Sequence, residues 1–246
     1  IYMKIDEDLA EIIGMHIGDG CISVNKRYSE YYLGGDLKEE KEYHNSWVGP
    51  LFNKKIMIPL FGKKVNYKEH PKVGVYGFYI FNEDLVNFFK KLGVPHGPKI
   101  NIGIPKQILV NKKLSLRFLR GLFDTDGNIY FDKNRSAKNP KNDRPTIKLG
   151  TTSKKLANQV FTLLIMFRLH PRMKKPYKGK RDKNEVYTVL IYRKNDIESF
   201  INNIGFKNPK HYTKWFVFKK LGYCPSHTSL EERKTILRSK KVYKSS

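Results

Sequence analysis

The sequence predicts an α+β fold in which one unit, of the order αββαββα, occurs twice along the chain as a pseudo-twofold tandem repeat. Two observations support this prediction. A short apolar stretch occurs at 9–20 and again at 116–127, and each copy ends in Asp-Gly and leads into a β-like run. The same succession of helix and strand patterns then follows each copy. A repeat at this spacing predicts two similar halves with two antiparallel sheets, rather than a solenoid of short units.

Both copies read as helices that carry small residues four positions apart. These are Gly14 and Gly18 in the first copy, and Gly121 and Thr125 in the second. A glycine inside a helix costs roughly 0.5–1 kcal/mol relative to alanine, which is offset where another backbone must come close. We therefore expect the two helices to pack side by side, with Asp19 and Asp126 adjacent at one end of the pair.

The first half continues with patterns of alternating type. Asp8 and Glu11 form a capping-box pattern at the start of the first helix. The runs 21–25 and 28–35 read as a hairpin around a polar turn. The remaining elements expected in this half are a charge-rich helix at 38–56, strands at 63–69 and 73–81, and a helix at 83–92. His16, inside the first helix, is interpreted as a packing residue.

The second half repeats this order after a connector rich in proline and glycine. Ser115 is expected to cap the second helix and Ser153 a later one. The other expected elements are a short helix at 106–111, strands at 128–133, 144–151, 171–177 and 185–192, helices at 153–167 and 194–203, and a final helix at 209–221 with Lys240 to Ser246 disordered. The predicted division is an N-terminal half at 1–93, a connector at 94–114, a C-terminal half at 115–205 and a basic extension at 206–246.

The charge balance indicates a polyanionic partner. The 246 residues include 48 Lys and Arg against 23 Asp and Glu, a formal net charge of +25. An excess of this size destabilises a compact chain by self-repulsion, so nucleic acid is the natural partner. No stretch approaches the ~20 apolar residues of a spanning helix. The two cysteines form no CxxC pair, so we expect an intracellular protein, in the cytoplasm, the nucleoid or an organelle.

The paired Asp-Gly sequences predict a metal site. Two carboxylates held together repel each other, and a divalent cation relieves that repulsion. Oxygen ligands suit Mg²⁺, and shared carboxylates support phosphodiester cleavage. A single Asp-Gly after a helix is most often only a turn, but two copies in matching contexts favour the metal. A calcium loop starting at Asp124 is excluded, because Ile129 and Arg135 stand where that loop needs Gly and Glu.

Residues 12–20 and 119–127 resemble the two signature helices of the LAGLIDADG homing endonucleases, in their monomeric, two-motif form. The second copy is close to the family pattern, whereas the first has Ile17 in place of the earlier acid and Gly18 in place of alanine. The resemblance covers residues 5 to about 205. It implies two curved DNA-binding sheets that form a saddle, with the signature helices packed at the centre.

The resemblance also implies a reaction and its ligands. It implies a metal-dependent double-strand cut in a long, asymmetric DNA target, with Asp19 and Asp126 as the functional acids. The backbone carbonyls of Gly18 and Thr125 complete the metal shell, and Mn²⁺ or Ca²⁺ could replace Mg²⁺. Members of the family often add a lysine near the scissile phosphates, for which Lys38 and Lys148 are the candidates.

Residues that contact DNA are expected on alternate positions of four strands and in the loops between them. The strand segments are 28–33, 76–79, 146–152 and 187–193, which would face the major groove. The residues singled out are Lys26, Arg27, Tyr28, Tyr31, Lys133, Arg135, Lys148, Thr151, Lys178, Lys180, Arg181 and Arg193. Loop lysines contact mainly phosphates, which gives affinity with little sequence information.

Three other interpretations compete with an endonuclease. A repressor or an intron maturase on the same scaffold would bind DNA or intron RNA without cutting. The endonuclease part of an intein would need splicing residues, but this sequence starts with Ile1 and ends in Lys-Ser-Ser, so a free-standing or intron-encoded monomer is expected. A ribosomal or architectural protein would explain the charge but not the paired glycine-bearing helices.

Overall fold

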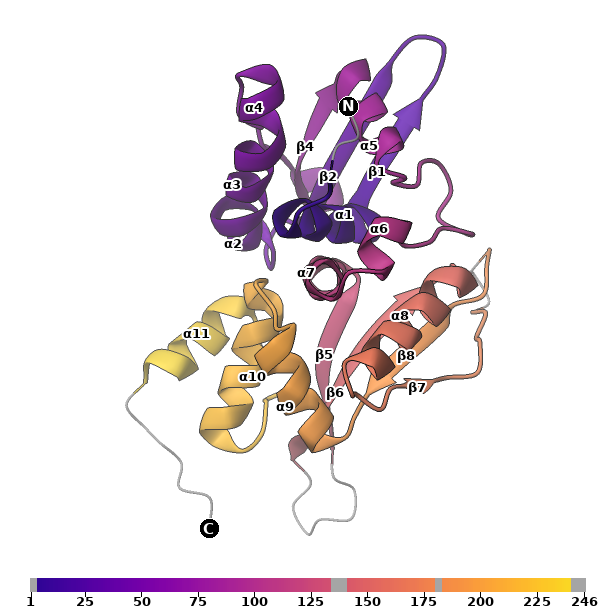
Figure 1. Ribbon diagram of the computed structural model, residues 1–246. Helices are drawn as coiled ribbons and strands as arrows, with labels where there is room; N and C mark the ends of the chain where they lie inside the picture. The colour runs from indigo at the N-terminus through magenta and orange to yellow at the C-terminus, as the bar shows by residue number, and fades with distance from the viewer. Residues whose placement is uncertain (1–3, 134–140, 180–182, 240–246) are drawn as a thin grey trace.

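The computed structural model describes residues 4–133, 141–179 and 183–239, which form two similar halves stacked on a central pair of helices (Figure 1). Helix α1 (Glu7–Asp19) opens the first half and α7 (Lys112–Thr125) the second. Both lie at the centre of the molecule, with one sheet on each side. None of the helices within these described ranges is long and apolar enough to cross a membrane.

The first half follows α1 with a four-stranded antiparallel sheet in the order β1-β2-β4-β3. Its strands are β1 (Gly20–Val24), β2 (Ser29–Asp36), β3 (Lys68–His70) and β4 (Val75–Phe81), and α5 (Glu83–Lys91) closes it. The charge-rich segment 41–61 is one long helical stretch of α2 (Lys41–Tyr43), α3 (Gly49–Phe52) and α4 (Ile58–Phe61), joined by π-helical turns. Each π turn precedes a proline at the second position of the next segment, where regular α-helical bonding is interrupted.

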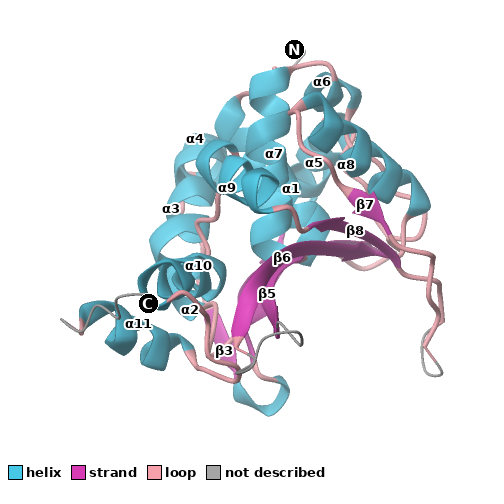
Figure 2. Cartoon of the chain, turned by 90° about the horizontal axis from the view of Figure 1, so that it is seen from below, coloured by secondary structure: helices cyan, strands magenta, loops and turns pink. Residues whose placement is uncertain are grey.

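The second half repeats this arrangement, with the sheet order β5-β6-β8-β7. Its elements are β5 (Gly127–Lys133), β6 (Asn142–Thr151), α8 (Lys154–Met166), β7 (Arg172–Met173), β8 (Tyr187–Ile191) and α9 (Lys194–Asn203). The connector carries α6 (Lys106–Leu109). Figure 2 shows β5, β6 and β8 as one curved sheet with helices gathered on its convex side. The predicted pair of antiparallel sheets around two central helices is therefore confirmed.

Backbone contact between α1 and α7 explains the glycines inside them. A Cβ atom added at Gly14 would overlap the carbonyl oxygen of Phe118 and lie 2.9 Å from the Leu122 nitrogen. A Cβ atom at Gly121 would overlap the carbonyl oxygen of Glu11 and lie 3.0 Å from the nitrogen of Met15. The two sets of contacts exchange under the pseudo-twofold axis. The predicted side-by-side packing is confirmed.

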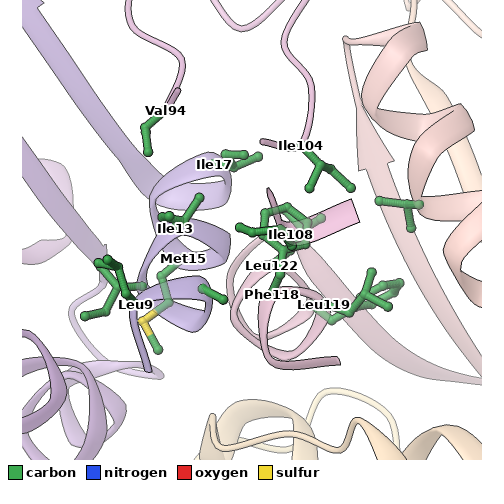
Figure 3. Close-up of a cluster of buried hydrophobic side chains, with 14 of the residues drawn as sticks. Leu9, Ile13, Met15, Ile17, Val94, Ile104, Ile108, Phe118, Leu119 and Leu122 are labelled. Atoms are coloured by element: carbon green, nitrogen blue, oxygen red, sulfur yellow. The ribbon is translucent and has the colours of Figure 1, made fainter. Parts of the chain in front are cut away.

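Apolar side chains surround this contact and join the two halves into one core (Figure 3). The labelled members are Leu9, Ile13, Met15, Ile17, Val94, Ile104, Ile108, Phe118, Leu119 and Leu122. His16 belongs to the same interior: it is 2% exposed and its ring stacks on Tyr31 and Phe89. Its interpretation as a packing residue is confirmed.

Several helix starts and strand ends differ from the sequence predictions. Asp6, not Asp8, caps α1 by accepting a hydrogen bond from the Leu9 nitrogen. Asn111, not Ser115, caps α7, and the Ser115 hydroxyl instead donates to the Ile108 carbonyl. The predicted strands at 63–69 and 171–177 are reduced to the short edge strands β3 and β7, as is common for sheet edges. The Ser153 cap is confirmed.

A C-terminal extension bridges the two halves. Helix α10 (Pro209–Leu221) has the predicted bounds and packs on β5, where the rings of Phe218 and Phe131 lie 5.2 Å apart. Helix α11 (Leu230–Arg238), which the sequence analysis did not predict, returns to the first half. There the buried Arg233 donates to Glu39 at 2.7 Å. The predicted disorder of 240–246 lies outside the described residues.

Candidate catalytic site and nucleic-acid interface

Asp19 and Asp126 lie where the two central helices end. A Cβ atom added at Gly18 would lie 2.7 Å from the Cβ of Thr125, so the last turns of α1 and α7 are in contact. This contact places the two carboxylates that follow near each other. As a consequence, the charge of Asp126 is one cause of the raised Asp19 pKa. Asp19 is half-buried and Asp126 is exposed.

Both carboxylates hold protons more tightly than ordinary aspartates. Burial, followed by the charges of Glu40 and Asp126, raises the pKa of Asp19 to about 7. The Asp126 residue as a whole is exposed, but burial of its carboxyl raises the pKa of that group to about 6. Lys99 opposes both shifts. A carboxylate pair with raised pKa values is an arrangement that a divalent cation would stabilise.

Lys99 is a residue of the site that the sequence analysis missed. Its ammonium donates hydrogen bonds to the carbonyl oxygen of Gly18 and, at 3.4 Å, to that of His16. Burial lowers the Lys99 pKa, while the charges of Asp126 and Asp19 act in the opposite direction. The Lys99 carbonyl in turn accepts a hydrogen bond from Thr152 at 3.1 Å. Lys99 comes from the connector, far in sequence from both aspartates.

The two lysines singled out from the sequence lie on other elements than Lys99, one in the first half and one in the second. Lys38 is exposed in the turn after β2, where its backbone nitrogen donates to Asp36. Lys148 is half-buried on β6, directly opposite Asn128. Lys99, rather than either of these residues, donates to the Gly18 carbonyl.

The donor set around the two aspartates fits a hard cation. The Gly18 carbonyl oxygen accepts a hydrogen bond from the Lys99 ammonium, so it already interacts with a cation. The carbonyl of Thr125 occupies the related position at the end of α7. Within the described ranges, no three His, Cys, Asp or Glu side chains could hold a metal together. Two carboxylates and backbone oxygens would leave the rest of a metal shell to water or phosphate, as Mg²⁺ prefers.

Solved structures share this architecture. The homing endonuclease I-DmoI in complex with DNA and Mn has a TM-score of 0.57 and 17% identity, covering 81% of this chain and 96% of that chain. The LAGLIDADG homing endonuclease I-LtrWI bound to target DNA has a TM-score of 0.57 and 14% identity, covering 87% and 88%. The family model "LAGLIDADG-like domain" matches residues 113–205. This is the LAGLIDADG fold. The resemblance inferred from the two motifs is confirmed.

Curated relatives match most of this chain within much longer proteins. The replication factor C small subunit of Methanocaldococcus jannaschii is 26% identical over 211 residues, which is 85% of this chain and 10% of that protein. The glutamine–fructose-6-phosphate aminotransferase of the same organism is 26% identical over 210 residues, 81% of this chain and 16% of that protein. The chain thus spans only a small part of these relatives.

The two apolar stretches differ at one position, Asp124 in the second and Ile17 in the first, and the structure gives a reason. Asp124, the earlier acid of the second motif, is buried and accepts hydrogen bonds from the backbone nitrogens of Lys207 and Asn208, both at 2.9 Å. It thereby anchors the start of α10. Ile17 occupies the corresponding position in α1, where it packs in the core at 1% exposure.

The prediction of a DNA contact is wrong for two residues, Tyr31 and Thr151, because their side chains point into the core. Tyr31 is fully buried and stacks on Phe89 at 4.7 Å. Thr151 is 9% exposed, and its hydroxyl accepts a hydrogen bond from the Ser153 nitrogen. Both lie at the inward phase of their strands.

The other predicted contacts lie at the surface or outside the described residues. The exposed residues are Lys26, Arg27, Tyr28, Lys133, Lys178 and Arg193. Arg135, Lys180 and Arg181 lie outside the described residues. On the second sheet, the outward positions of β6 and β7 place Lys148 and Arg172 across from Leu190 of β8. This surface of the LAGLIDADG fold is the candidate nucleic-acid interface.

Proposed function

We propose that the chain is a site-specific DNA endonuclease that makes a divalent-metal-dependent cut in both strands of a long, asymmetric target. One observation carries the proposal: Asp19 and Asp126 lie together at the ends of two glycine-packed helices, with a curved sheet on either side. A carboxylate pair between two DNA-reading surfaces is suited to cleavage near the middle of a bound duplex. The I-DmoI and I-LtrWI structures, which contain DNA, support the choice of substrate.

The two aspartates would hold the metal together with the carbonyl oxygens of Gly18 and Thr125. The bound ion supplies Lewis-acid activation of the phosphate and lowers the pKa of a bound water. Mg²⁺ is the ion we propose, and structures of I-DmoI with Mn and with Ca support a site that accepts other divalent cations. The close packing at Gly18 and Thr125 fixes the separation of the carboxylates.

We assign the role of catalytic lysine to Lys99 in place of Lys38 or Lys148. Its ammonium lies beside both carboxylates, where it would stabilise negative charge that develops on a phosphate during cleavage. The carbonyl contact to Gly18 holds the side chain at the site before DNA arrives. Lys38 and Lys148 are more suitable for phosphate contacts, because the first is exposed on a turn and the second lies on the outer side of β6.

The net charge of +25 supports binding to double-stranded DNA. Neutralising backbone phosphates gives affinity that falls steeply with salt. The sheets would supply sequence information by placing alternate side chains in the major groove.

The relatives bear on how such an enzyme is encoded. The matching segment accounts for 10% and 16% of two proteins whose names denote unrelated activities. We therefore propose that the nuclease is either encoded in an intron or inserted as a segment within a longer protein.

The test is cleavage of a randomised plasmid pool with Mg²⁺ and with EDTA. Wild type would run beside Asp19→Asn and Asp126→Asn, with Glu83→Gln, an exposed carboxylate on α5, as the matched control. The proposal predicts discrete Mg²⁺-dependent double-strand cuts that both aspartate variants lose or reduce to nicks. A duplex pool enriched for tight binding that stays uncut would instead establish a silent DNA- or RNA-binding protein, such as a repressor or maturase.

A further inference from the structure

The outer face of the first sheet carries a ladder of aromatic rings. Tyr32 on β2 pairs with Tyr79 on β4, and their ring centroids lie 4.6 Å apart. Tyr28, just before β2, makes an edge contact with Phe81 at 5.7 Å. His70 on β3 adds a further edge contact to Tyr79 at 5.5 Å. We call these five residues the aromatic ladder.

The ladder residues lie on the outward face of the sheet and do not belong to the core. Side chains alternate between the two faces of a strand. Tyr31 and Phe78, the neighbours of Tyr32 and Tyr79, are fully buried on the inner face. In contrast, Phe81 is 66% exposed, Tyr28 44% and Tyr79 40%. Large aromatic side chains exposed as a group indicate a binding surface.

The ladder is continuous with the candidate catalytic site. Tyr32 pairs with Cys21, two residues after Asp19, so the inner end of the ladder lies beside the end of α1. Gly34 leaves room for that ring, because a Cβ atom added there would lie 2.8 Å from the Tyr32 Cζ. A ligand that reaches Asp19 from this side therefore passes over the ladder.

The second sheet presents different chemistry at the related positions. Tyr32 lies opposite Cys21 in the first sheet, and Lys148 lies opposite Asn128 in the second. Arg172 flanks the same row on β7 and is exposed. Tyr130, Asp132 and Tyr192 lie on the same face, so the second sheet mixes charged and separate aromatic side chains. The aromatic ladder, whose rings contact one another, lies on the first sheet.

A carboxylate within the aromatic face argues against phosphate as its ligand. Glu30 pairs with Phe81 on the same outward phase. Its negative charge would repel a DNA phosphate, whereas carboxylates accept hydrogen bonds from the amino group of cytosine. The first sheet is therefore suited to base edges, and the phosphate contacts fall to the loops around it.

We propose that the first sheet recognises a thymine-rich half-site through contacts between the aromatic ladder and thymine C5-methyl groups. This inference rests on the proposed function. Thymine is the base that offers an apolar group in the major groove, and Phe81 has no hydrogen-bonding atom with which to read any other feature. On the second sheet, the exposed Arg172 reads the other half-site by contacts to guanine, so the two half-sites differ in composition.

The first experiment is selection of bound duplexes from a random library by the wild-type protein in EDTA. An iron chelate attached to Lys26→Cys, in a Cys21→Ser background, would mark the outer end of the half-site beneath the first sheet. Lys26 is exposed in the β1–β2 turn. Thymine should be enriched in the marked half-site and guanine in the other. A marked half-site without thymine enrichment would overturn the inference.

The second experiment replaces thymine by uracil, which keeps every hydrogen-bonding group and loses only the methyl. In the marked half-site, each contacted methyl should account for about a fourfold loss of affinity. Uracil in the other half-site is the matched control and should change affinity little. Equal tolerance of uracil in both halves would overturn the inference, with DNA binding and the proposed function intact.

Variants connect the preference to the ladder. Phe81→Ser and Tyr79→Ser should remove thymine enrichment from the marked half-site, whereas Tyr192→Ser, an exposed aromatic 48% accessible beyond β8, should leave it. Thermal unfolding should change little for Phe81→Ser, because the Phe81 side chain is 66% exposed. Tyr79→Ser should lower the unfolding temperature modestly, because the Tyr79 ring contacts Tyr32 and His70. Thymine enrichment that persists in both ladder variants would contradict the assignment. Failure of the wild-type protein to enrich any duplex would overturn the proposed function as well.

Discussion

Lys99 donates a hydrogen bond to the carbonyl oxygen of Gly18, the oxygen proposed as a metal ligand. The ammonium of this connector residue thus contacts the same carbonyl oxygen that a bound metal would use as a ligand. The ammonium also lowers the pKa values of Asp19 and Asp126 relative to what burial alone would give. Lys99 therefore stabilises the charged carboxylates before a metal binds, and it competes with the metal for Gly18.

Replacing Lys99 with methionine separates these two effects. Lys99→Met should bind Mn²⁺ several-fold more tightly in the absence of DNA, because the competing ammonium is gone. Its cleavage rate should fall by about 10²-fold or more, since a charge that stabilises the transition state is lost. Metal titration by calorimetry and single-turnover cleavage of a selected site would measure both.

Lys38→Met and Lys148→Met are the matched controls, because these are the lysines singled out from the sequence. Each should leave Mn²⁺ affinity unchanged and weaken DNA binding with a smaller salt slope. If Lys148→Met lost cleavage to the same extent as Lys99→Met while DNA binding stayed intact, the assignment of a single catalytic lysine would be wrong.

The glycine contacts between α1 and α7 predict a large stability effect from one methyl group. Gly14→Ala or Gly121→Ala would place a Cβ atom against backbone of the facing helix, which cannot move aside as a side chain would. Overpacking of this kind costs about 1–3 kcal/mol and exceeds the helix-propensity gain of alanine. Urea unfolding would measure the loss.

Gly150→Ala is the control for this prediction. A Cβ atom there would lie 3.6 Å from Val186, an ordinary packing distance. Its free energy of unfolding should stay within about 0.5 kcal/mol of wild type, as for surface substitutions generally. Equal losses at all three glycines would show that close contact between the helices does not set the effect.

The fold and the carboxylate pair could be predicted because their signals are local and repeated. Glycines at matching positions of two apolar stretches fixed the packing of α1 on α7, and therefore the position of Asp19 beside Asp126. The inward positions of the strands could also be predicted from the alternation of apolar residues. Leu33, Ile147 and Leu149 mark these positions, so Tyr31 and Thr151 point inward as well. Their prediction as DNA contacts overlooked this alternation.

Lys99 and Arg233 could not be predicted in the same way. Both act through contacts between segments distant in sequence: Lys99 with the end of α1, and Arg233 with Glu39. Among 48 Lys and Arg residues, no local pattern distinguishes a buried cation from a solvated one. The tertiary path of the connector and of the C-terminal extension decides which lysine or arginine is enclosed.

The raised pKa values predict how metal binding and stability change with pH. The Asp19 and Asp126 pKa values of about 7 and about 6 lie above the ordinary aspartate value, so the metal-free folded state binds more protons than the unfolded state between about pH 4 and 7. Stability contributed by these groups is therefore present at low pH and is lost as pH rises through 6 to 7. Metal should reverse this trend by stabilising the charged pair.

Asp19→Asn tests this directly. At pH 8 without metal the variant should unfold about 2–4 °C above wild type, because a repelled carboxylate is gone. At pH 4.5 the difference should disappear, and Mg²⁺ should stabilise wild type but not the variant. Glu83→Gln is the control and should show no such dependence. A variant less stable than wild type at pH 8 would show that the Asp19 carboxylate makes a stabilising contact.

The C-terminal extension should hold the halves together through Arg233. This side chain is 1% exposed and donates to Glu39 of the first half, to Thr213 of α10 at 2.9 Å and to the Thr228 carbonyl. Arg233→Met should destabilise the protein by about 2–4 kcal/mol, because the half-buried Glu39 loses its buried partner and the Thr213 and Thr228 oxygens lose a donor. Hydrogen exchange would show faster exchange in α11 and at the start of α10, while α1 and α7 change little.

The double variant Arg233→Met with Glu39→Gln distinguishes a broken ion pair from lost packing. Removing the unpaired carboxylate should recover a substantial part of the stability lost in Arg233→Met, since replacing both partners of a buried pair is often nearly neutral. Lys219→Met, whose ammonium makes a surface ion pair with Glu198 at 3.5 Å, is the control and should cost less than about 1 kcal/mol. If the double variant were no more stable than Arg233→Met, the packing of the arginine side chain, not its charge, would hold α11 in place.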